Sequence, residues 1–289
     1  MGAGAVVAAA LFVVSTPIGN LGDITHRAVE TLRASDVVLA EDTRRTGMLL
    51  RHLGISTRLV SAHEHNEAAR ASTVVAMLGE GKQVSLVSDA GTPLLSDPGA
   101  RIVREVVEAG FDVVPIPGAS ALLSALVGSG IEADAFTFHG FPPRKGPERT
   151  ELLEEVASSR RASVLYESPN RVARLLTDLA GAAGAERRVA VARELTKMHE
   201  EFFRGTAAEG AVHFSAGEVL GEIVVVVAGR VGDAPAEEAV DEMAARAIAG
   251  ALLAQGESPS GVARELRRRL GIARNDAYRI AQEAAGAEE

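Results

Sequence analysis

The chain contains no cysteine, which excludes disulfide bonds, thiolate metal ligands and cysteine nucleophiles. Lysine is scarce as well, because of the 30 basic residues only Lys82, Lys145 and Lys197 are lysines. A chain that uses arginine this consistently is expected to keep lysine where a compact or deprotonatable amine is needed. Lys82 lies in a turn and is interpreted as incidental, so Lys145 and Lys197 are the lysine candidates for chemistry.

Long apolar runs are missing. No segment approaches the roughly 18 to 20 apolar residues of a membrane span, so no membrane partner is expected. The apolar start at Ala5–Val14 has no basic residue before it and runs directly into Ser15-Thr16-Pro17. This context favours a buried first strand over a secretion signal. Together with the absence of cysteine, it predicts a cytoplasmic protein.

The charge and the motifs restrict the function further. A net charge of −9 argues against a surface covered with nucleic-acid contacts, although it allows a local basic patch. The first glycine turn, Thr16–Asp23, has neither the G-x-G-x-x-G pattern of dinucleotide folds nor the G-K-[ST] of phosphate loops. With 47% hydrophobic and 24% charged residues, the 289-residue chain has a globular composition and allows one large or two medium domains.

Short valine-rich runs alternate with amphipathic stretches of helix length, which is the pattern of an α/β protein with a parallel sheet. The first domain is expected over residues 1–117, with five strands joined by helical crossovers. Its predicted strands are Val6–Ser15, Val37–Ala40, Leu59–Ser61, Val84–Ser88 and Val113–Pro115. Its predicted helices are Thr25–Ala34, Thr43–Leu53, Asn66–Gly79 and Gly99–Ala109.

A second α/β domain is expected over residues 118–232. Some of its strands lie too close together in sequence for parallel crossovers, which predicts a mixed sheet with Val224–Val227 in a central buried strand. From residue 236 to 289 the periodicity is helical only, which predicts a small helix-turn-helix-like module for RNA binding. The predicted strands are Phe136–His139, Ser163–Glu167, Arg188–Arg193, Glu200–Gly205 and Glu222–Ala228, and the predicted module helices are Glu237–Ala254, Pro259–Leu270 and Arg274–Ala285.

Two turns of similar chemistry follow apolar strands, at Ser15–Asn20 and Ser88–Pro93. Strands of a parallel sheet that end at the same edge in glycine, proline and aspartate form a ligand crevice. Pro117–Ser120 adds a third turn of small residues, interpreted as another wall of that crevice. Asp89 is a candidate acceptor for hydroxyl or amine hydrogens, and Asp97 is a candidate cap for the next helix.

Charged residues gather after several of the predicted strands. Arg44 and Arg45 stand in the first turn of a helix, where they oppose the helix dipole, so a contact with a polyanion is expected there. Arg144 and Lys145 follow a Pro-Pro loop, and Glu167 precedes Arg171. Mixed charge usually marks solvated surface, but several such clusters at strand ends favour a shared site. The helical module adds the candidate phosphate contacts Arg264, Arg267, Arg268, Arg269 and Arg274.

Taken together, the motifs Ser15–Thr25, Glu41–Arg44, Ser88–Pro93 and Tyr166–Pro169 closely resemble those of the RsmI family. This family is the ribosomal branch of the tetrapyrrole-methylase-like (class III) methyltransferases, and the resemblance covers the whole chain. It implies S-adenosylmethionine-dependent 2'-O-methylation of a cytidine in the decoding region of 16S ribosomal RNA. It also implies two α/β domains with the cofactor in the cleft between them, and a homodimer. The implied cofactor-binding residues are Pro17, Gly19, Asp89, Ala90, Gly91, Thr92, Pro93, Ser120, Ala121, Tyr166, Leu195 and Thr196.

The proton acceptor is a separate question, because a ribose hydroxyl is a weak acid and general base catalysis contributes about 10²–10⁴-fold. We consider Lys197 or Lys145 as the base or as the group that orients the oxygen, with Glu194 and Glu167 holding the amine. Desolvation beside other cations would lower the lysine pKa enough for this role. Arg44, Arg144 and Arg171 are expected to hold the RNA backbone, and no metal is expected.

Three other functions remain open at this point. A tetrapyrrole or other small-molecule methylase shares the implied fold but has no need of a basic helical tail. A methylase acting on a diphthamide precursor meets the same objection. A non-catalytic RNA-binding protein that senses a nucleotide would bind the cofactor without turnover. The substrate is expected to be the assembled 30S subunit, where the shape of a folded particle supplies specificity.

Overall fold

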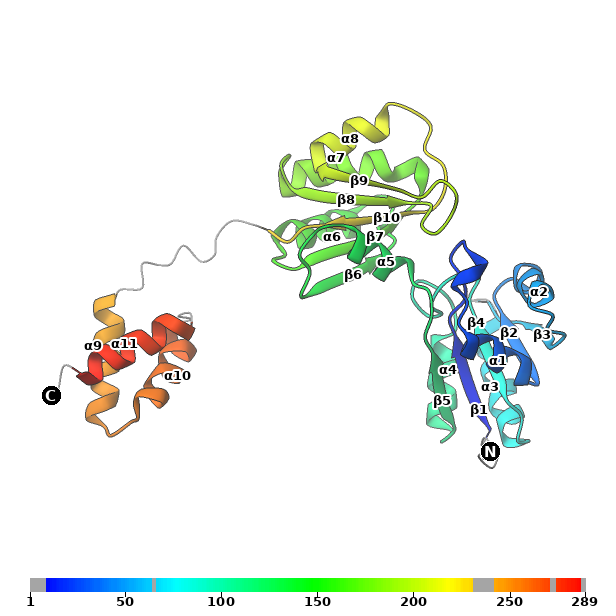
Figure 1. The fold of residues 1–289 in the computed structure, drawn as a ribbon, viewed down its shortest axis with the longest axis horizontal. Helices are drawn as coiled ribbons and strands as arrows, with labels where there is room; N and C mark the ends of the chain where they lie inside the picture. Colours follow the sequence, from blue (N-terminus) through cyan, green and yellow to red (C-terminus); the bar gives the residue numbers. More distant parts are fainter. Residues whose placement is uncertain (1–8, 64–65, 231–241, 271–273, 287–289) are drawn as a thin grey trace. The chain divides into compact units, whose positions relative to one another are not determined.

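The structure is a computed structural model that describes residues 9–63, 66–230, 242–270 and 274–286 (Figure 1). The chain divides into two units, Met1–Arg230 and Val231–Glu289. The first residues of the predicted strand Val6–Ser15 and of the predicted helix Glu237–Ala254 lie outside the described residues, as do residues 231–232. Within the described ranges, no helix combines the length and the apolar character needed to cross a membrane.

The first sheet of the larger unit is entirely parallel, with the strand order β3-β2-β4-β1-β5. Helices α1 and α2 pack on one face of this sheet, and α3 and α4 pack on the other. The strands are β1 (Ala10–Val14), β2 (Val37–Ala40), β3 (Arg58–Ser61), β4 (Val84–Val87) and β5 (Asp112–Ile116). The helices are α1 (His26–Ala34), α2 (Thr43–His52), α3 (Glu67–Gly79) and α4 (Ala100–Glu108), with a short 3-10 turn, η1, at Leu21–Asp23.

The second sheet has the order β6-β7-β10-β8-β9 and is mixed, because only β6 and β7 pair in parallel. β10 is the central strand and all five of its residues are buried, which confirms the prediction for this run. The strands are β6 (Phe136–Gly140), β7 (Ala162–Glu167), β8 (Arg188–Arg193), β9 (Glu201–Thr206) and β10 (Ile223–Val227). The helices are α5 (Ala121–Gly128), α6 (Pro147–Ser158), α7 (Val172–Ala183) and α8 (Ala207–Ser215), with a 3-10 turn, η3, at Pro169–Arg171.

The two faces of the second sheet pack differently. One face is covered by α6, α7 and α8, of which α6 and α8 are not among the predicted helices. The other face packs against α5 and against Ile18, which comes from the turn after β1. The fold class of two α/β sheets, one parallel and one mixed, is therefore confirmed. The division of this unit at residue 117 stays a prediction.

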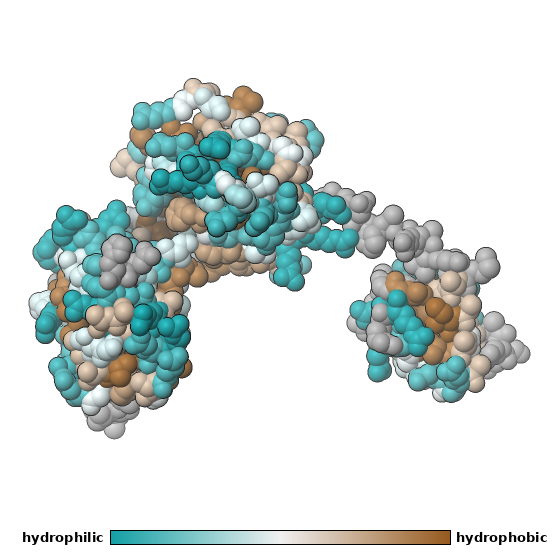
Figure 2. Space-filling view, turned by 180° about the vertical axis from the view of Figure 1, so that it is seen from behind, coloured by the Kyte–Doolittle hydropathy of each residue, from teal (hydrophilic) through white to brown (hydrophobic). Residues whose placement is uncertain are grey.

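The smaller unit consists of α9 (Glu242–Ala254), α10 (Pro259–Leu270) and α11 (Arg274–Gly286). Its core is built mostly from small side chains, with Leu266 and Ile280 fully buried at its centre. Gly256 has a φ of +88° and makes the turn between α9 and α10 without the steric cost that a side chain would bring. Figure 2 shows a band of hydrophobic residues beside hydrophilic ones on the visible face of this unit.

Candidate active site

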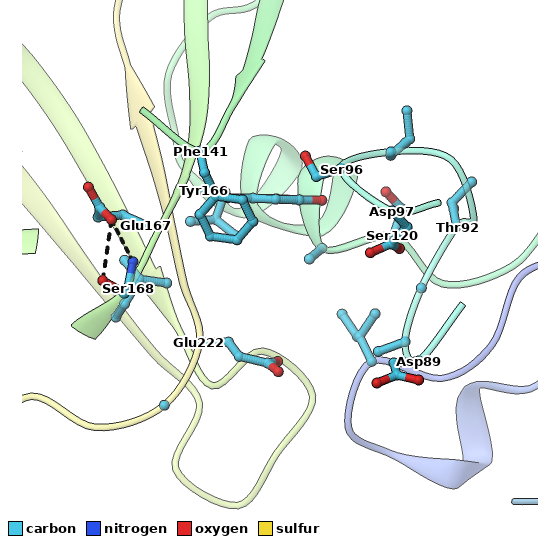
Figure 3. Close-up of a pocket in the computed structure, with 18 of the residues that line it drawn as sticks. Asp89, Thr92, Ser96, Asp97, Ser120, Phe141, Tyr166, Glu167, Ser168 and Glu222 are labelled. Atoms are coloured by element: carbon cyan, nitrogen blue, oxygen red, sulfur yellow. Dashed lines mark hydrogen bonds between the residues drawn. The ribbon is translucent and has the colours of Figure 1, made fainter. Parts of the chain in front are cut away.

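A cavity of about 460 Å³ opens between loops that extend from both sheets of the larger unit (Figure 3). Its first wall is formed by the loops that follow β2 and β4, together with Ile18. Its second wall is formed by the start of α5, the end of β7 and the turn that enters β10. The volume lies within the range of about 300–1,000 Å³ that is usual for small-molecule sites.

The two glycine turns lie side by side because β1 and β4 are neighbours in the sheet. Thr16 and Gly91 exchange backbone hydrogen bonds of 2.9 and 3.0 Å, and so form an isolated bridge between the turns. Gly91 has a φ of +80°, and a Cβ on it would lie 3.2 Å from the side chain of Ile18. Glycine is therefore required there both by the backbone conformation and by the available space.

The third small-residue turn joins the other two. The hydroxyl of Thr92 donates a hydrogen bond to the carbonyl of Ala119 at 3.2 Å and accepts one from the hydroxyl of Ser15 at 3.4 Å. Ser120 caps α5, because its hydroxyl accepts a hydrogen bond from the amide of Leu123. The expected convergence of the three turns is therefore present in the structure.

Backbone strain is concentrated in two loops beside the cavity. Leu94 and Ser96, in the loop after β4, have φ values of +75° and +66°. Glu194 and Thr196, in the loop after β8, have φ values of +50° and +66°. Such conformations cost about 1–3 kcal/mol per residue and cluster at functional sites. The strain marks these two loops as candidates for function.

The first wall of the cavity carries three carboxylates, from Glu41, Asp89 and Asp97. Asp89 accepts hydrogen bonds from the amide of Asp42 at 2.9 Å and from the guanidinium of Arg45 at 3.2 Å. Burial, followed by repulsion from Glu41, raises the pKa of Asp97 to about 6. Burial and the neighbouring Asp89 also raise the pKa of Glu41. Negative charge therefore exceeds positive charge on this wall.

Arg44 and Arg45 pair with local carboxylates, and their contact with a polyanion stays a prediction. Arg45 reaches Asp89, and Arg44 forms an ion pair of 3.1 Å with Asp42 while staying 89% exposed. Both arginines thus compensate local carboxylates at the start of α2. The expected cap at Asp97 is wrong, because Glu67 accepts the hydrogen bonds from the first amides of α4.

The second wall presents an aromatic cluster. Tyr166 packs edge-to-face against Phe138 and Phe141, with ring centroids 4.9 and 5.5 Å apart. Its hydroxyl points across the cavity toward the loop that carries Ser96 and Asp97 (Figure 3). Burial raises the pKa of this hydroxyl, so it stays protonated.

Lys197 lies in the strained loop after β8 and is held by two carboxylates. Its amine donates hydrogen bonds to Glu194 at 2.8 Å and to Glu222, a cavity residue, at 3.3 Å. Partial burial lowers the pKa of this amine, but the hydrogen bonds and charges of Glu194 and Glu222 outweigh it, and the pKa is raised. The expected lowering of the lysine pKa is therefore wrong for Lys197, which stays a cation at neutral pH.

Glu167 occupies a different environment from the expected one. Glu167 lines the cavity, but its side chain is buried and accepts hydrogen bonds from the amide of Ser168 at 2.7 Å and from Nε of Arg171 at 2.6 Å. The role of holding a lysine amine is corrected accordingly, because Glu167 pairs with Arg171. Glu194 and Glu222 hold Lys197, while Lys145 is exposed in the loop before α6.

The structure brings many of the expected cofactor residues together. The cavity is lined by Asp89, Ala90, Gly91, Thr92, Ser120, Ala121 and Tyr166. Pro17, Gly19, Pro93, Leu195 and Thr196 do not line it, although Gly19 packs closely against Thr196 and Lys197. The other lining residues were not expected at the cofactor site, and they are Ile18, Glu41, Arg45, Leu95, Ser96, Asp97, Phe141, Glu167, Ser168, Pro169, Gly221, Glu222, Ile223 and Val224.

The candidate RNA contacts are spread over both units. Arg144 is exposed beside Lys145, and Arg171 is engaged by Glu167. In the helical unit, Arg264 and Arg267 are exposed and Arg269 pairs with Glu265 at 2.7 Å. The side chains of Arg268 and Arg274 lie outside the described residues. Across the part of the chain that the structure covers, no group of three or more His, Cys, Asp or Glu residues is arranged to hold a metal ion.

Comparison with known proteins places this site in a family. A family model described as Tetrapyrrole (Corrin/Porphyrin) Methylases matches residues 10–211. A ribosomal RNA small subunit methyltransferase I of Synechocystis is 44% identical over 277 residues, which span 94% of this chain and 97% of that protein. Its counterpart in Escherichia coli O157:H7 is 41% identical over 279 residues, which span 96% of each chain.

Solved structures support the fold. A cobalt precorrin-4 methyltransferase has a TM-score of 0.58 at 17% identity, covering 78% of this chain and 97% of its own. A uroporphyrin-III-C-methyltransferase from Thermus thermophilus has a TM-score of 0.53 at 19% identity, covering 75% and 93%. The chain therefore belongs to the ribosomal RNA small subunit methyltransferase I family within the tetrapyrrole methylases, and it is a methyltransferase.

Proposed function

We propose that this methyltransferase transfers a methyl group from S-adenosylmethionine to the ribose 2'-oxygen of a cytidine in the decoding region of small-subunit ribosomal RNA. One observation carries the choice of substrate. Relatives named as ribosomal RNA small subunit methyltransferases are 41–48% identical to this chain, whereas the solved tetrapyrrole methylases are 17–19% identical to it. The sequence is thus much more similar to the ribosomal RNA enzymes than to the solved tetrapyrrole enzymes, which supports a ribosomal RNA substrate.

The residues of the cavity fit this cofactor. The carboxylates of Glu41 and Asp97 suit a ligand with a positively charged sulfur, and the rings of Tyr166 and Phe141 suit an organic cation and an adenine ring. The backbone of the turn at residues 89–92 and the start of α5 offer hydrogen bonds for the polar ends of the ligand. When bound, the cofactor supplies an activated methyl group.

The chain's own contribution to the reaction is to position the ribose and to take its proton. Asp97 is the proposed proton acceptor, because its carboxylate lines the cavity and its pKa of about 6 leaves it mostly ionised at neutral pH while keeping it basic. Lys197, held protonated by Glu194 and Glu222, is the proposed donor that orients an oxygen at the cavity mouth. Alignment of this kind contributes about 7–11 kcal/mol in favourable cases.

RNA recognition is assigned to the helical unit and to exposed arginines of the larger unit. Arg264 and Arg267 are exposed on α10, and Arg44 and Arg144 are exposed on the larger unit. These positions supply phosphate contacts without base readout. We further propose that the enzyme is a cytoplasmic homodimer and that its substrate is the assembled 30S subunit. Recognition of a folded particle supplies specificity that a protein with a net charge of −9 does not gain from electrostatic attraction to RNA.

The test is methyl transfer from labelled S-adenosylmethionine. Small subunits that lack the modification, naked 16S ribosomal RNA and uroporphyrinogen III are offered in parallel to the purified protein. Label in the subunit RNA is the expected result, and preference for the particle over naked RNA supports the 30S assignment. Label only in the tetrapyrrole would contradict the proposed substrate, and tight cofactor binding with no transfer to any acceptor would favour a non-catalytic protein.

A further inference from the structure

The first wall of the cavity carries more negative charge than its neighbours compensate. Glu41, Asp89 and Asp97 line the cavity, and Arg45 is paired with Asp89 at 3.2 Å. On the opposite wall, Glu222 is already compensated by Lys197 at 3.3 Å. Arg45 also lowers the pKa of Glu41 in part, but among the described residues neither Glu41 nor Asp97 forms an ion pair within 4 Å, and both face the cavity.

We propose that Glu41 and Asp97 make this cavity discriminate between the positively charged methyl donor and its neutral, demethylated product. This inference rests on the proposed function, because it assumes that the donor is S-adenosylmethionine. The two ligands, S-adenosylmethionine and S-adenosylhomocysteine, share the adenosine and the amino acid ends. They differ only in one methyl group and the charge of the sulfur.

Burial raises the pKa of both Asp97 and Glu41, and repulsion from neighbouring carboxylates adds to it, from Glu41 at Asp97 and from Asp89 at Glu41. A cation bound between them removes part of that repulsion, whereas a neutral thioether leaves it in place. The donor thus gains a stabilisation that the product lacks, and the product leaves more readily once the methyl group has gone.

The aromatic wall reinforces this selectivity. The ring of Tyr166 faces the same cavity and packs against Phe138 and Phe141. Aromatic faces attract organic cations, most strongly where water is excluded. Tyr166 stays neutral because burial raises its pKa, so it adds no competing charge. The cavity therefore has carboxylates on its first wall and aromatic rings on its second wall, and both kinds of group attract a sulfonium ion.

Isothermal titration calorimetry on the full-length protein measures the dissociation constants of both ligands and therefore their ratio. The variants are Glu41→Gln and Asp97→Asn, which keep hydrogen-bond acceptors at both positions. Glu108→Gln is the matched control, because Glu108 is an exposed carboxylate at the end of α4 that does not line the cavity. We expect each cavity variant to reduce the preference for S-adenosylmethionine about fivefold to tenfold, and the control to leave it unchanged.

Proton linkage provides an independent readout. Titrations at pH 6 in buffers of different ionisation enthalpy count the protons released on binding. The titratable and charged groups that line the cavity are Glu41, Arg45, Asp89, Asp97, Tyr166, Glu167 and Glu222. We expect the donor to release more protons than the product, because a cation lowers the pKa of Asp97 and Glu41. Asp97→Asn is expected to remove most of that difference.

The outcomes separate this inference from the function on which it rests. If the unmodified protein binds both ligands but the ratio of the two dissociation constants is unchanged in Glu41→Gln and Asp97→Asn, the inference is overturned and the cofactor assignment stands. If a variant binds both ligands more weakly by the same factor, the inference is also overturned, because the ratio of the two dissociation constants is then unchanged. If the unmodified protein binds neither ligand, the cofactor assignment itself is contradicted.

Discussion

The backbone amide of Asn20 donates a hydrogen bond to the hydroxyl of Thr196, 3.0 Å away and 176 residues further along the chain. This bond joins the turn after β1 to the strained loop after β8. Gly19 makes the approach possible, because a Cβ there would lie 2.5 Å from Cγ of Lys197 and 2.9 Å from the hydroxyl of Thr196. The position of Lys197 thus depends on a glycine in the other sheet's loop.

Gly19→Ala is therefore expected to displace the loop of Thr196 and Lys197. Overpacking of this kind costs about 1–3 kcal/mol, and the shift of Lys197 is expected to lower kcat at least tenfold. Urea unfolding and methyl transfer measure the two effects. Gly181→Ala is the control, because the space around Gly181 in α7 is open and alanine favours a helix. Full activity of Gly19→Ala would show that the loop does not depend on this contact.

Lys197 is expected to act as a cation and not as a base. Glu194 and Glu222 raise its pKa, so Lys197→Arg should retain much of the activity and Lys197→Met should lose about 100-fold. The rates of both variants are measured under saturating donor, with Lys145→Arg in parallel. Because Lys145 is exposed in a loop, its substitution is expected to change RNA affinity more than kcat. Normal turnover by the Lys197→Met variant would show that the Lys197 amine has no role in the reaction.

Asp97 gives the reaction a characteristic pH dependence. The pKa of Asp97 is about 6 in the free protein and is lowered by the bound cationic donor, so the rate should be level above pH 6 and should approach a tenfold fall per pH unit below the lowered pKa. Asp97→Asn should abolish this limb and lower kcat by about 10²–10⁴-fold. Single-turnover rates from pH 5 to 8 measure both. An acid limb that persists in the variant would assign the proton acceptor elsewhere.

The same substitution is expected to stabilise the fold. A carboxyl whose pKa is raised on folding opposes folding above that pKa and has no effect below its unfolded value, so stability is lost as the pH rises from about 4 to 6. Asp97→Asn should therefore raise the free energy of unfolding at pH 7 by about 1 kcal/mol, after discounting for partial exposure, and leave it unchanged at pH 3.5. Urea titrations at the two pH values measure this; a loss of stability at pH 7 would contradict it.

Glu167 is expected to serve stability and not chemistry. Its buried carboxylate pairs with Arg171 at the start of α7, so Glu167→Ala should lower the free energy of unfolding by about 3 kcal/mol. Activity per folded molecule should stay near normal at low temperature. Glu154→Ala, at an exposed position of α6, is the control. If the Glu167→Ala variant lost activity while its stability was unchanged, Glu167 would have a role in the reaction.

The sequence predicted the parts of the site that depend on local chemistry. The turns around Gly91 and Ser120 follow strands in the chain and need small residues where they stand, so their convergence follows from the strand order of a parallel sheet. The positions of Glu222 and Phe141 at the cavity could not be predicted from the sequence, because they depend on how the second sheet packs against the first. The raised pKa of Lys197 was not predicted either, because Glu222 reaches this lysine from a turn 25 residues further along the chain.

The central claim is that the methyl group is attached to a ribose oxygen of cytidine. Its most direct test is nucleoside mass spectrometry of 16S ribosomal RNA after incubation of unmodified small subunits with the protein and S-adenosylmethionine. We predict one 2'-O-methylcytidine per subunit, absent when Asp97→Asn replaces the unmodified protein under the same conditions. A methyl group on a base, or on the ribose of another nucleoside, would contradict the account.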